Sequence, residues 1–204
     1  MTFCAPVTLE GQHVRLEPLA AEHHDELVDA VKDGELWQLW YTTIPSPEQM
    51  RAEIARRLDL RARGSMLPFV IRRLDTGALC GMTTYMNVEE KYRRVEIGST
   101  WMAASAQRTA INSEAKLLLL SYAFEALRCI VVEFHTNFMN MQSRAAIARL
   151  GAKQDGILRN NGITPGGQYR DTVVFSIIES EWATVKQHLQ YKLARHGNSP
   201  ANAT

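Results

Sequence analysis

The stretch from Val95 to Leu120, VEIGSTWMAASAQRTAINSEAKLLLL, constrains the fold of this chain more than any other part. Val95, Ile97 and Trp101 favour a strand, and residues 103–112 contain no bulky apolar run. The last eight residues are mostly good helix formers. The stretch therefore predicts a strand, a turn and a long apolar helix. Free backbone N–H groups at the helix start suit a phosphate or pyrophosphate, although an ordinary turn between strand and helix has the same pattern.

Composition limits the classes of protein that remain. We expect one domain over residues 1–195 and a flexible tail over 196–204. A hydrophobic content of 46% and a net charge of +1 without a long basic run favour a soluble protein that does not bind nucleic acid. No apolar segment approaches the roughly 20 residues of a membrane span, and the N-terminus lacks the pattern of a signal peptide. The cysteines are widely spaced and odd in number, so we expect no metal site and a cytoplasmic location.

Hydrophobic periodicity and turn residues divide the rest of the chain into alternating elements. Strands are predicted over residues 13–19, 66–72, 78–86, 95–101, 129–134, 153–158 and 169–178. Helices are predicted over residues 21–31, 46–63, 112–126, 141–150 and 181–193. Ser46 and Gln49 form a capping-box pattern at the second helix, and Gly64 follows its end. This order predicts a mixed sheet with helices on its faces.

Four motifs, taken in order, give the chain a family resemblance. They are Glu96-Ile97-Gly98, Gln107-Arg108-Thr109-Ala110-Ile111-Asn112, Asn140-Met141-Gln142-Ser143, and Gly156-Ile157-Leu158-Arg159 followed by Arg170-Asp171. Over residues 13–182 the chain resembles the GNAT superfamily of acyl-CoA-dependent N-acetyltransferases, and more narrowly its ribosomal-protein N-terminal (alanine/serine) acetyltransferase branch. The resemblance implies an α/β (α+β) fold. Its mixed, mostly antiparallel central sheet would carry helices on both faces and splay between the fourth strand, 95–101, and the fifth, 129–134.

The resemblance also implies a site for acetyl-CoA or coenzyme A. The second motif stands at the family's Q/R-x-x-G-x-G/A pyrophosphate loop, but Ala110 replaces its first glycine and Asn112 its second small residue. We expect Asn112 to cap the helix and the loop to bind pyrophosphate through backbone N–H groups. The expected cofactor contacts are Trp101, Met102, Gln107, Arg108, Thr109, Ala110, Ile111, Asn112, Ser113, Asn140, Ser143 and Arg144. Arg144 is equally well interpreted as an exposed helix arginine.

Amide formation from a thioester requires a neutral amine, a polarised carbonyl and a proton for the thiolate. An α-amine with a pKa of about 8 is much easier to neutralise at pH 7 than a lysine amine at about 10.4. Glu96 is the candidate base, although a cross-strand ion pair with Arg93 or a neighbour would also explain it. Backbone N–H groups around Trp101 and Met102 would polarise the carbonyl. Ile147 stands where many members have a tyrosine acid, so the resemblance gives that role to Ser143, which could also be a capping serine.

The acceptor amine is the least determined part of this hypothesis. The aromatic cluster of Trp37, Trp40 and Tyr41 either lines a substrate pocket or packs two helices together. We expect a peptide or protein N-terminal α-amine; alternatives are a small-molecule amine, such as an amino acid, a polyamine or an antibiotic, and a non-catalytic acyl-CoA-binding protein. A homodimer through the C-terminal strands or the last helix rests on family grounds only. His135 is interpreted as a core or strand-end residue, and Asp171 as a structural partner of a nearby donor.

Overall fold

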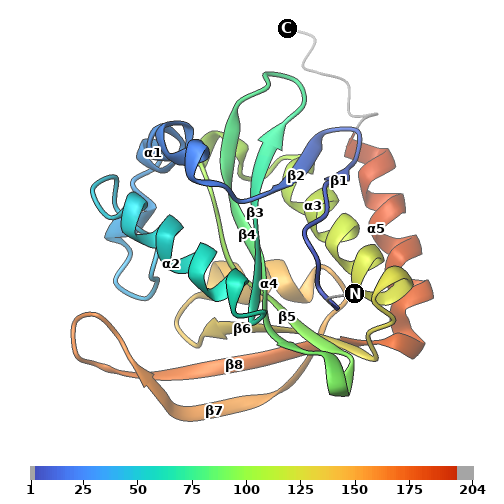
Figure 1. Cartoon of the computed structure of the whole chain (residues 1–204). Helices are drawn as coiled ribbons and strands as arrows, with labels where there is room; N and C mark the ends of the chain where they lie inside the picture. The colour runs from blue at the N-terminus through green and yellow to red at the C-terminus, as the bar shows by residue number, and fades with distance from the viewer. Residues whose placement is uncertain (1–2, 197–204) are drawn as a thin grey trace, which may run out of the picture.

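A single eight-stranded sheet organises the computed structural model, which describes residues 3–196 (Figure 1). The spatial order of the strands is β1-β2-β3-β4-β5-β6-β8-β7. Their bounds are β1 Leu9–Glu10, β2 Val14–Pro18, β3 Met66–Arg73, β4 Leu79–Glu89, β5 Arg94–Met102, β6 Val131–Asn137, β7 Lys153–Ile163 and β8 Tyr169–Ile178. Neighbouring strands are antiparallel except β5 and β6, which are parallel. The predicted mixed, mostly antiparallel sheet is confirmed.

Helices cover both faces of this sheet, with α1 and α2 on one side and α3 and α5 on the other (Figure 1). They are α1 His24–Lys32, α2 Met50–Ala62, α3 Ala110–Ser121, α4 Met141–Ala148 and α5 Trp182–His196; a π-helical turn at Tyr122–Ala126 continues α3. Short 3-10 turns lie at Ala21–His23, Leu36–Gln38, Glu90–Tyr92, Ala104–Ala106 and Glu179–Glu181. Because side chains alternate along a strand, Val70 packs toward α1 and α2 while Phe69 and Ile71 pack toward α3 and α5.

All seven predicted strands and all five predicted helices are present, with shifted ends. The two-residue strand β1 was not predicted. The second helix, α2, begins at Met50 rather than at Pro47, because residues 47–49 form a turn. The glutamine half of the predicted capping box is present, since Gln49 Oε1 accepts the N–H of Ser46 at 3.1 Å. Gly64, with a φ of +75°, follows its end as predicted. Of the expected C-terminal tail, 196–204, only His196 lies in the described part, as the last residue of α5.

The gap between β5 and β6 is the feature that creates the site. The two strands pair only over Arg94–Glu96 and Val131–Glu133, and the rest of both strands is unpaired along this edge. On its other edge β5 carries a bulge: Met82 pairs with Trp101 and Thr84 with Gly98, so two residues of β5 oppose one of β4. Ser99, inside the bulge, has a φ of +46°. The predicted splay between the fourth and fifth strands is confirmed.

A buried carboxylate fixes α3, the helix that borders the gap, to the sheet. Glu114 accepts the backbone N–H groups of Gln12, His13 and Val14 at 2.8, 2.7 and 2.9 Å. Gly11 lies against this carboxylate, where a Cβ would collide with it. The N-terminal strands thereby set the position of α3. None of the helices in the described part of the chain is both long and apolar enough to cross a bilayer.

Candidate active site

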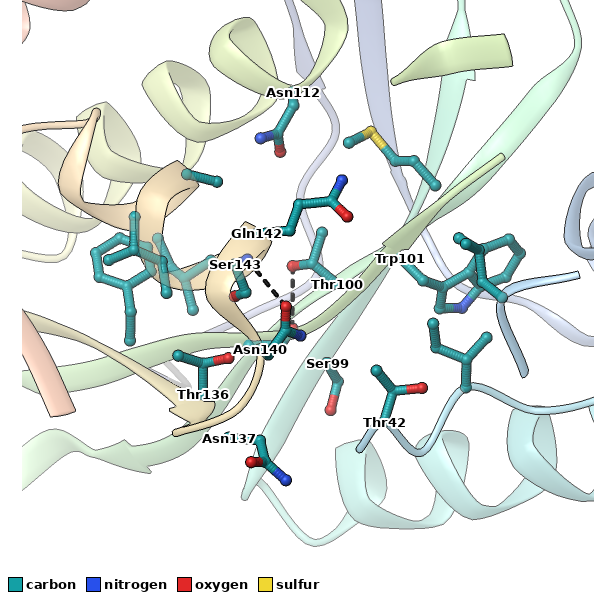
Figure 2. Close-up of a pocket in the computed structure, with 18 of the residues that line it drawn as sticks. Thr42, Ser99, Thr100, Trp101, Asn112, Thr136, Asn137, Asn140, Gln142 and Ser143 are labelled. Carbon is teal, nitrogen blue, oxygen red and sulfur yellow. Dashed lines mark hydrogen bonds between the residues drawn. The ribbon is translucent and has the colours of Figure 1, made fainter. Parts of the chain in front are cut away.

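A cavity of about 760 Å³ fills the gap between β5 and β6. This volume lies within the range of about 300–1,000 Å³ that is typical of ligand sites. Its walls come from β5, β6, the start of α3, α4 and the loop before α2. Figure 2 shows Thr100 on β5, Asn112 on α3 and Ser143 on α4 around the same space. Elements that are far apart in the sequence therefore meet at the point where the sheet opens.

The charge of the cavity wall is predominantly positive. Its cationic side chains are Arg56, Arg57, Arg108, Lys116, Arg149 and Arg170, and Glu53 is its only carboxylate among the described residues. A concave, low-dielectric site with such an excess concentrates anions. Together with the free N–H groups at the start of α3, these donors fit the phosphates of an acyl-CoA.

The predicted pyrophosphate loop lies at one end of this cavity. Five of its residues line the wall, namely Gln107, Arg108, Thr109, Asn112 and Ser113. Ala110 and Ile111 do not, since Ala110 is the first residue of α3 and Ile111 is buried in the core. Thr109 caps the helix, and its Oγ1 accepts the N–H of Ile111 at 3.3 Å. The expectation that Asn112 is the cap is wrong, because α3 starts two residues earlier than predicted.

The loop forms without the glycine that the family motif has at position 110. Arg108, not Ala110, has the left-handed backbone conformation, with a φ of +59°. Ala110 is already helical and therefore needs none of the freedom of glycine. Gln107 is held in place on both sides, because its Nε2 donates to the carbonyl of Met102 at 3.0 Å and its Oε1 accepts from Gln142 at 3.3 Å. The departure from the motif is thus compatible with a formed loop.

Helix α4 supplies the opposite wall. Asn140 is its N-cap, and its Oδ1 accepts the backbone N–H of Ser143 at 3.0 Å, a bond drawn in Figure 2. This bond uses the carbonyl of Asn140 and leaves its NH₂ group for another partner, while both residues line the cavity. Arg144 is not in the cavity wall. Its guanidinium stacks 4.7 Å from the ring centroid of Phe138 and donates to the carbonyl of that residue.

Glu96 lies next to the cavity but does not line it. Its carboxylate is 5% exposed, accepts from Asn87 Nδ2 at 2.7 Å and lies 3.3 Å from His135 Nδ1. Burial raises the pKa of the Glu96 carboxyl, and the neighbouring His135 opposes that effect. A carboxylate with a raised pKa is better suited to accept a proton near neutral pH. The alternative partner Arg93 forms no ion pair with it among residues 3–196.

His135 connects Glu96 to the cavity, a role that the sequence reasoning missed. It lies inside β6 rather than after the strand, and it lines the cavity while its Nε2 is 3.4 Å from Glu133. Because the predicted strand ended at residue 134, the alternation that directs His135 toward the gap was not visible. Asp171, by contrast, is the structural partner expected, because it accepts from Arg159 at 2.6 Å and from the N–H of Asn160 at 2.8 Å.

The aromatic cluster before α2 does not act as a unit. Tyr41 lines the main cavity, whereas Trp37 packs against the core on the α1 and α2 side. Trp40 is 56% exposed and borders a second hollow of about 270 Å³. Both hollows share Asn137, so the second one adjoins the first. Trp101 and Met102, the other predicted contacts, line the main cavity from β5.

Comparison with known proteins assigns this chain to a family. Residues 13–153 match the family described as "Acetyltransferase (GNAT) domain". A relative from Bacillus subtilis (strain 168), named "Putative ribosomal N-acetyltransferase YdaF", is 34% identical over 109 residues, which are 53% of this chain and 58% of the relative. The match therefore covers less than two thirds of that protein.

Solved structures agree over a longer span. The crystal structure of a GCN5-related N-acetyltransferase from Brucella melitensis has a TM-score of 0.81 and 30% identity, and it covers 98% of this chain and 89% of its own. Mycobacterium smegmatis RimJ in complex with CoA-disulfide has a TM-score of 0.77 and 22% identity, over 92% of this chain and 95% of its own. The chain belongs to the GNAT acetyltransferase family. The name of its Bacillus subtilis relative is that of the predicted branch.

Proposed function

We propose that this protein transfers an acetyl group from acetyl-CoA to a primary amine, most readily the N-terminal α-amine of a peptide or protein. The observation that carries the proposal is the cavity between β5 and β6, which is positive, lies at the free start of α3 and is floored by an unpaired strand edge. The fold is shared with a RimJ structure in complex with CoA-disulfide, which supports coenzyme A binding by this fold.

Different residues of the cavity would bind the cofactor and polarise the thioester carbonyl. Acetyl-CoA, when bound, would supply the thioester carbon that the amine attacks. Arg108 and the N–H groups at the start of α3 would bind its phosphates. Asn140 would bind the pantetheine arm. Backbone N–H groups on the unpaired edge of β5, near Trp101 and Met102, would donate to the carbonyl oxygen as negative charge develops.

The two proton transfers, from the acceptor amine and to the departing thiolate, would take place on opposite sides of the gap. Glu96 would accept a proton from the acceptor ammonium, so that the neutral amine can attack the thioester. His135 stands between the Glu96 carboxylate and the cavity, where it or a water molecule can carry this proton. Ser143 would donate a proton to the departing thiolate. Its hydroxyl has no partner within the described chain and belongs to the cavity wall, so it is free for that contact.

The second hollow favours a peptide over a small amine. It adjoins the main cavity at Asn137 and is bordered by exposed Trp40 and Tyr169, which leaves room for residues that follow an acceptor N-terminus. An amino acid or a polyamine would fill only the main cavity. A panel of peptides with alanine or serine first, compared with free amino acids and polyamines, would separate these substrates by kcat/KM. Coenzyme A binding without thiol release for any amine would instead indicate a non-catalytic acyl-CoA-binding protein.

Glu96→Gln is the first test of the chemistry. We expect kcat to fall by about 100-fold at pH 7, measured as thiol release from acetyl-CoA, because the base is lost while shape is kept. Glu22→Gln, which changes an exposed carboxylate that is not part of the cavity wall, is the matched control. A rate near that of the wild type would remove Glu96 from the mechanism. Ser143→Ala keeps the backbone bond to Asn140, and full turnover in that variant would exclude Ser143 as the acid.

A further inference from the structure

Lys116 is a buried amine that the chemistry above does not use. It lies on α3, one turn after Asn112 and Ser113, and it lines the cavity although its side chain is almost fully buried. Its Nζ donates to Thr83 Oγ1 at 3.2 Å and to Thr100 Oγ1 at 2.9 Å. Thr100 belongs to the β5 bulge, and Thr83 is the residue of β4 opposite that bulge. A buried charge usually has an ionic partner, so this arrangement calls for an explanation.

The hydrogen bonds around the amine form one directed chain when Lys116 is protonated. Nζ donates to both threonine hydroxyls. The two hydroxyl oxygens are 2.8 Å apart, and the Thr83 hydroxyl can donate to Thr100 Oγ1. Thr100 then donates to the carbonyl oxygen of Gly98 at 3.4 Å. The acceptors of these hydrogen bonds lie in the bulge, opposite it or directly next to it, so the amine fixes the strand segment that faces the acyl-CoA gap.

No negative group of the described chain neutralises Lys116. Strands β4 and β5 present threonines to it, and on α3 the carboxylate of Glu114 is turned to the N–H groups of Gln12–Val14. The other charged or titratable side chains of the cavity wall are Tyr41, Glu53, Arg56, Arg57, Arg108, His135, Arg149 and Arg170. Glu53 is paired with Arg56 and Arg57. Burial alone lowers the pKa of Lys116, to about 7.

We propose that Lys116 belongs to the cofactor site: it fixes the β5 bulge through Thr83 and Thr100, and it takes up a proton when the anionic cofactor binds. The proposal rests on the proposed function, because the missing negative charge is that of an acyl-CoA. A unit charge about 8 Å away at an effective dielectric constant of about 20 favours the ammonium more than tenfold. By linkage, cofactor affinity must then fall as pH rises through the range in which the empty site loses this proton.

The test is calorimetry of coenzyme A binding to the whole chain. Wild type should bind about tenfold more weakly at pH 8.5 than at pH 6.5, and near pH 7.5 it should take up protons, measured in two buffers of different ionisation enthalpy. The coenzyme A phosphates also titrate near pH 6, so the readout is the difference between wild type and Lys116→Met. That variant should lose the extra proton uptake. Lys91→Met, an exposed lysine in the β4–β5 turn, should behave as wild type.

A second variant covers the case in which Lys116→Met does not fold. Thr100→Val keeps the lysine but removes one acceptor of its ammonium, so the fall in affinity should move to lower pH. Equal proton uptake in wild type and Lys116→Met, or an unmoved pH profile in Thr100→Val, would overturn the inference and leave the proposed function standing. Absence of coenzyme A binding by wild type at every pH would count against the proposed function itself.

Discussion

Two buried cations meet the same bulge of β5 from opposite faces of the sheet. Arg57, on α2, donates to Thr84 Oγ1 at 2.7 Å and to the carbonyl of Ser99 at 3.4 Å. Lys116, on α3, holds the neighbouring hydroxyls on the other face. Arg57 has a carboxylate partner, because Glu53 lies 2.7 Å away, whereas Lys116 has none among residues 3–196. The two cations are equally buried but differ in whether the protein itself balances their charge.

This difference separates a structural from a functional charge. The charges of a buried ion pair balance each other within the folded chain, so removing one partner mainly lowers the free energy of unfolding. A buried cation without a counter-ion opposes folding while it is charged, so its presence at a cavity wall points to a ligand that supplies the missing charge. Arg57 should therefore matter most to folding, and Lys116 most to the occupied site.

Removing Arg57 should have the largest effect on stability. Arg57→Met breaks the buried pair and leaves the bulge carbonyl unpaired, and we expect a loss of about 3 kcal/mol in the free energy of unfolding. Urea denaturation measures it. Arg56→Met is the matched control: Arg56 contacts the same Glu53 but is half exposed, so its loss should cost less than about 1 kcal/mol. Equal effects of the two variants would show that burial does not distinguish these arginines.

Glu114 sharpens the comparison because it is the other buried charge of α3. Glu114→Gln replaces an acceptor by a donor opposite three backbone N–H groups, and we expect a loss of about 2 kcal/mol in the free energy of unfolding. Thermal and urea denaturation measure it, with Glu10→Gln, an exposed partner of Arg15, as the control. Coenzyme A affinity of the folded fraction should be unchanged. A variant that folds normally but fails to bind coenzyme A would place Glu114 with the site rather than the framework.

The same contrast explains what the sequence could predict. Strands such as β3 and helices such as α4 follow local patterns, and the family motifs located the gap and part of its wall. The contacts of the two cations with the bulge follow no local pattern, since Arg57 reaches Ser99 across 42 residues and Lys116 reaches Thr83 across 33. The Glu53–Arg57 spacing was visible as an i, i+4 pair on a helix, but nothing in it indicated burial.

Errors of two or three residues in the predicted ends of α3 and β6 led to wrong or missed assignments of site residues. Placing the start of α3 at Asn112 rather than Ala110 gave the cap to the wrong residue, although Thr109 is an ordinary capping residue. Ending the strand β6 at residue 134 rather than Asn137 hid His135 from the site. The bulge at Ser99 was not predicted either, because a serine with a φ of +46° is determined by pairing with β4 and not by its own preference.

Lys116 should give the smallest effect on stability, with a distinctive dependence on pH. Its pKa of about 7 in the folded chain lies below the value of about 10.4 expected when unfolded, so above pH 7 the unfolded chain binds more protons. The free energy of unfolding of wild type should then rise by about 1 kcal/mol from pH 7 to pH 8, relative to Lys116→Met, which lacks this titration. Urea denaturation of both proteins at the two pH values measures it. If both respond identically, Lys116 keeps its proton in the folded chain at pH 8, and the contrast with Arg57 disappears.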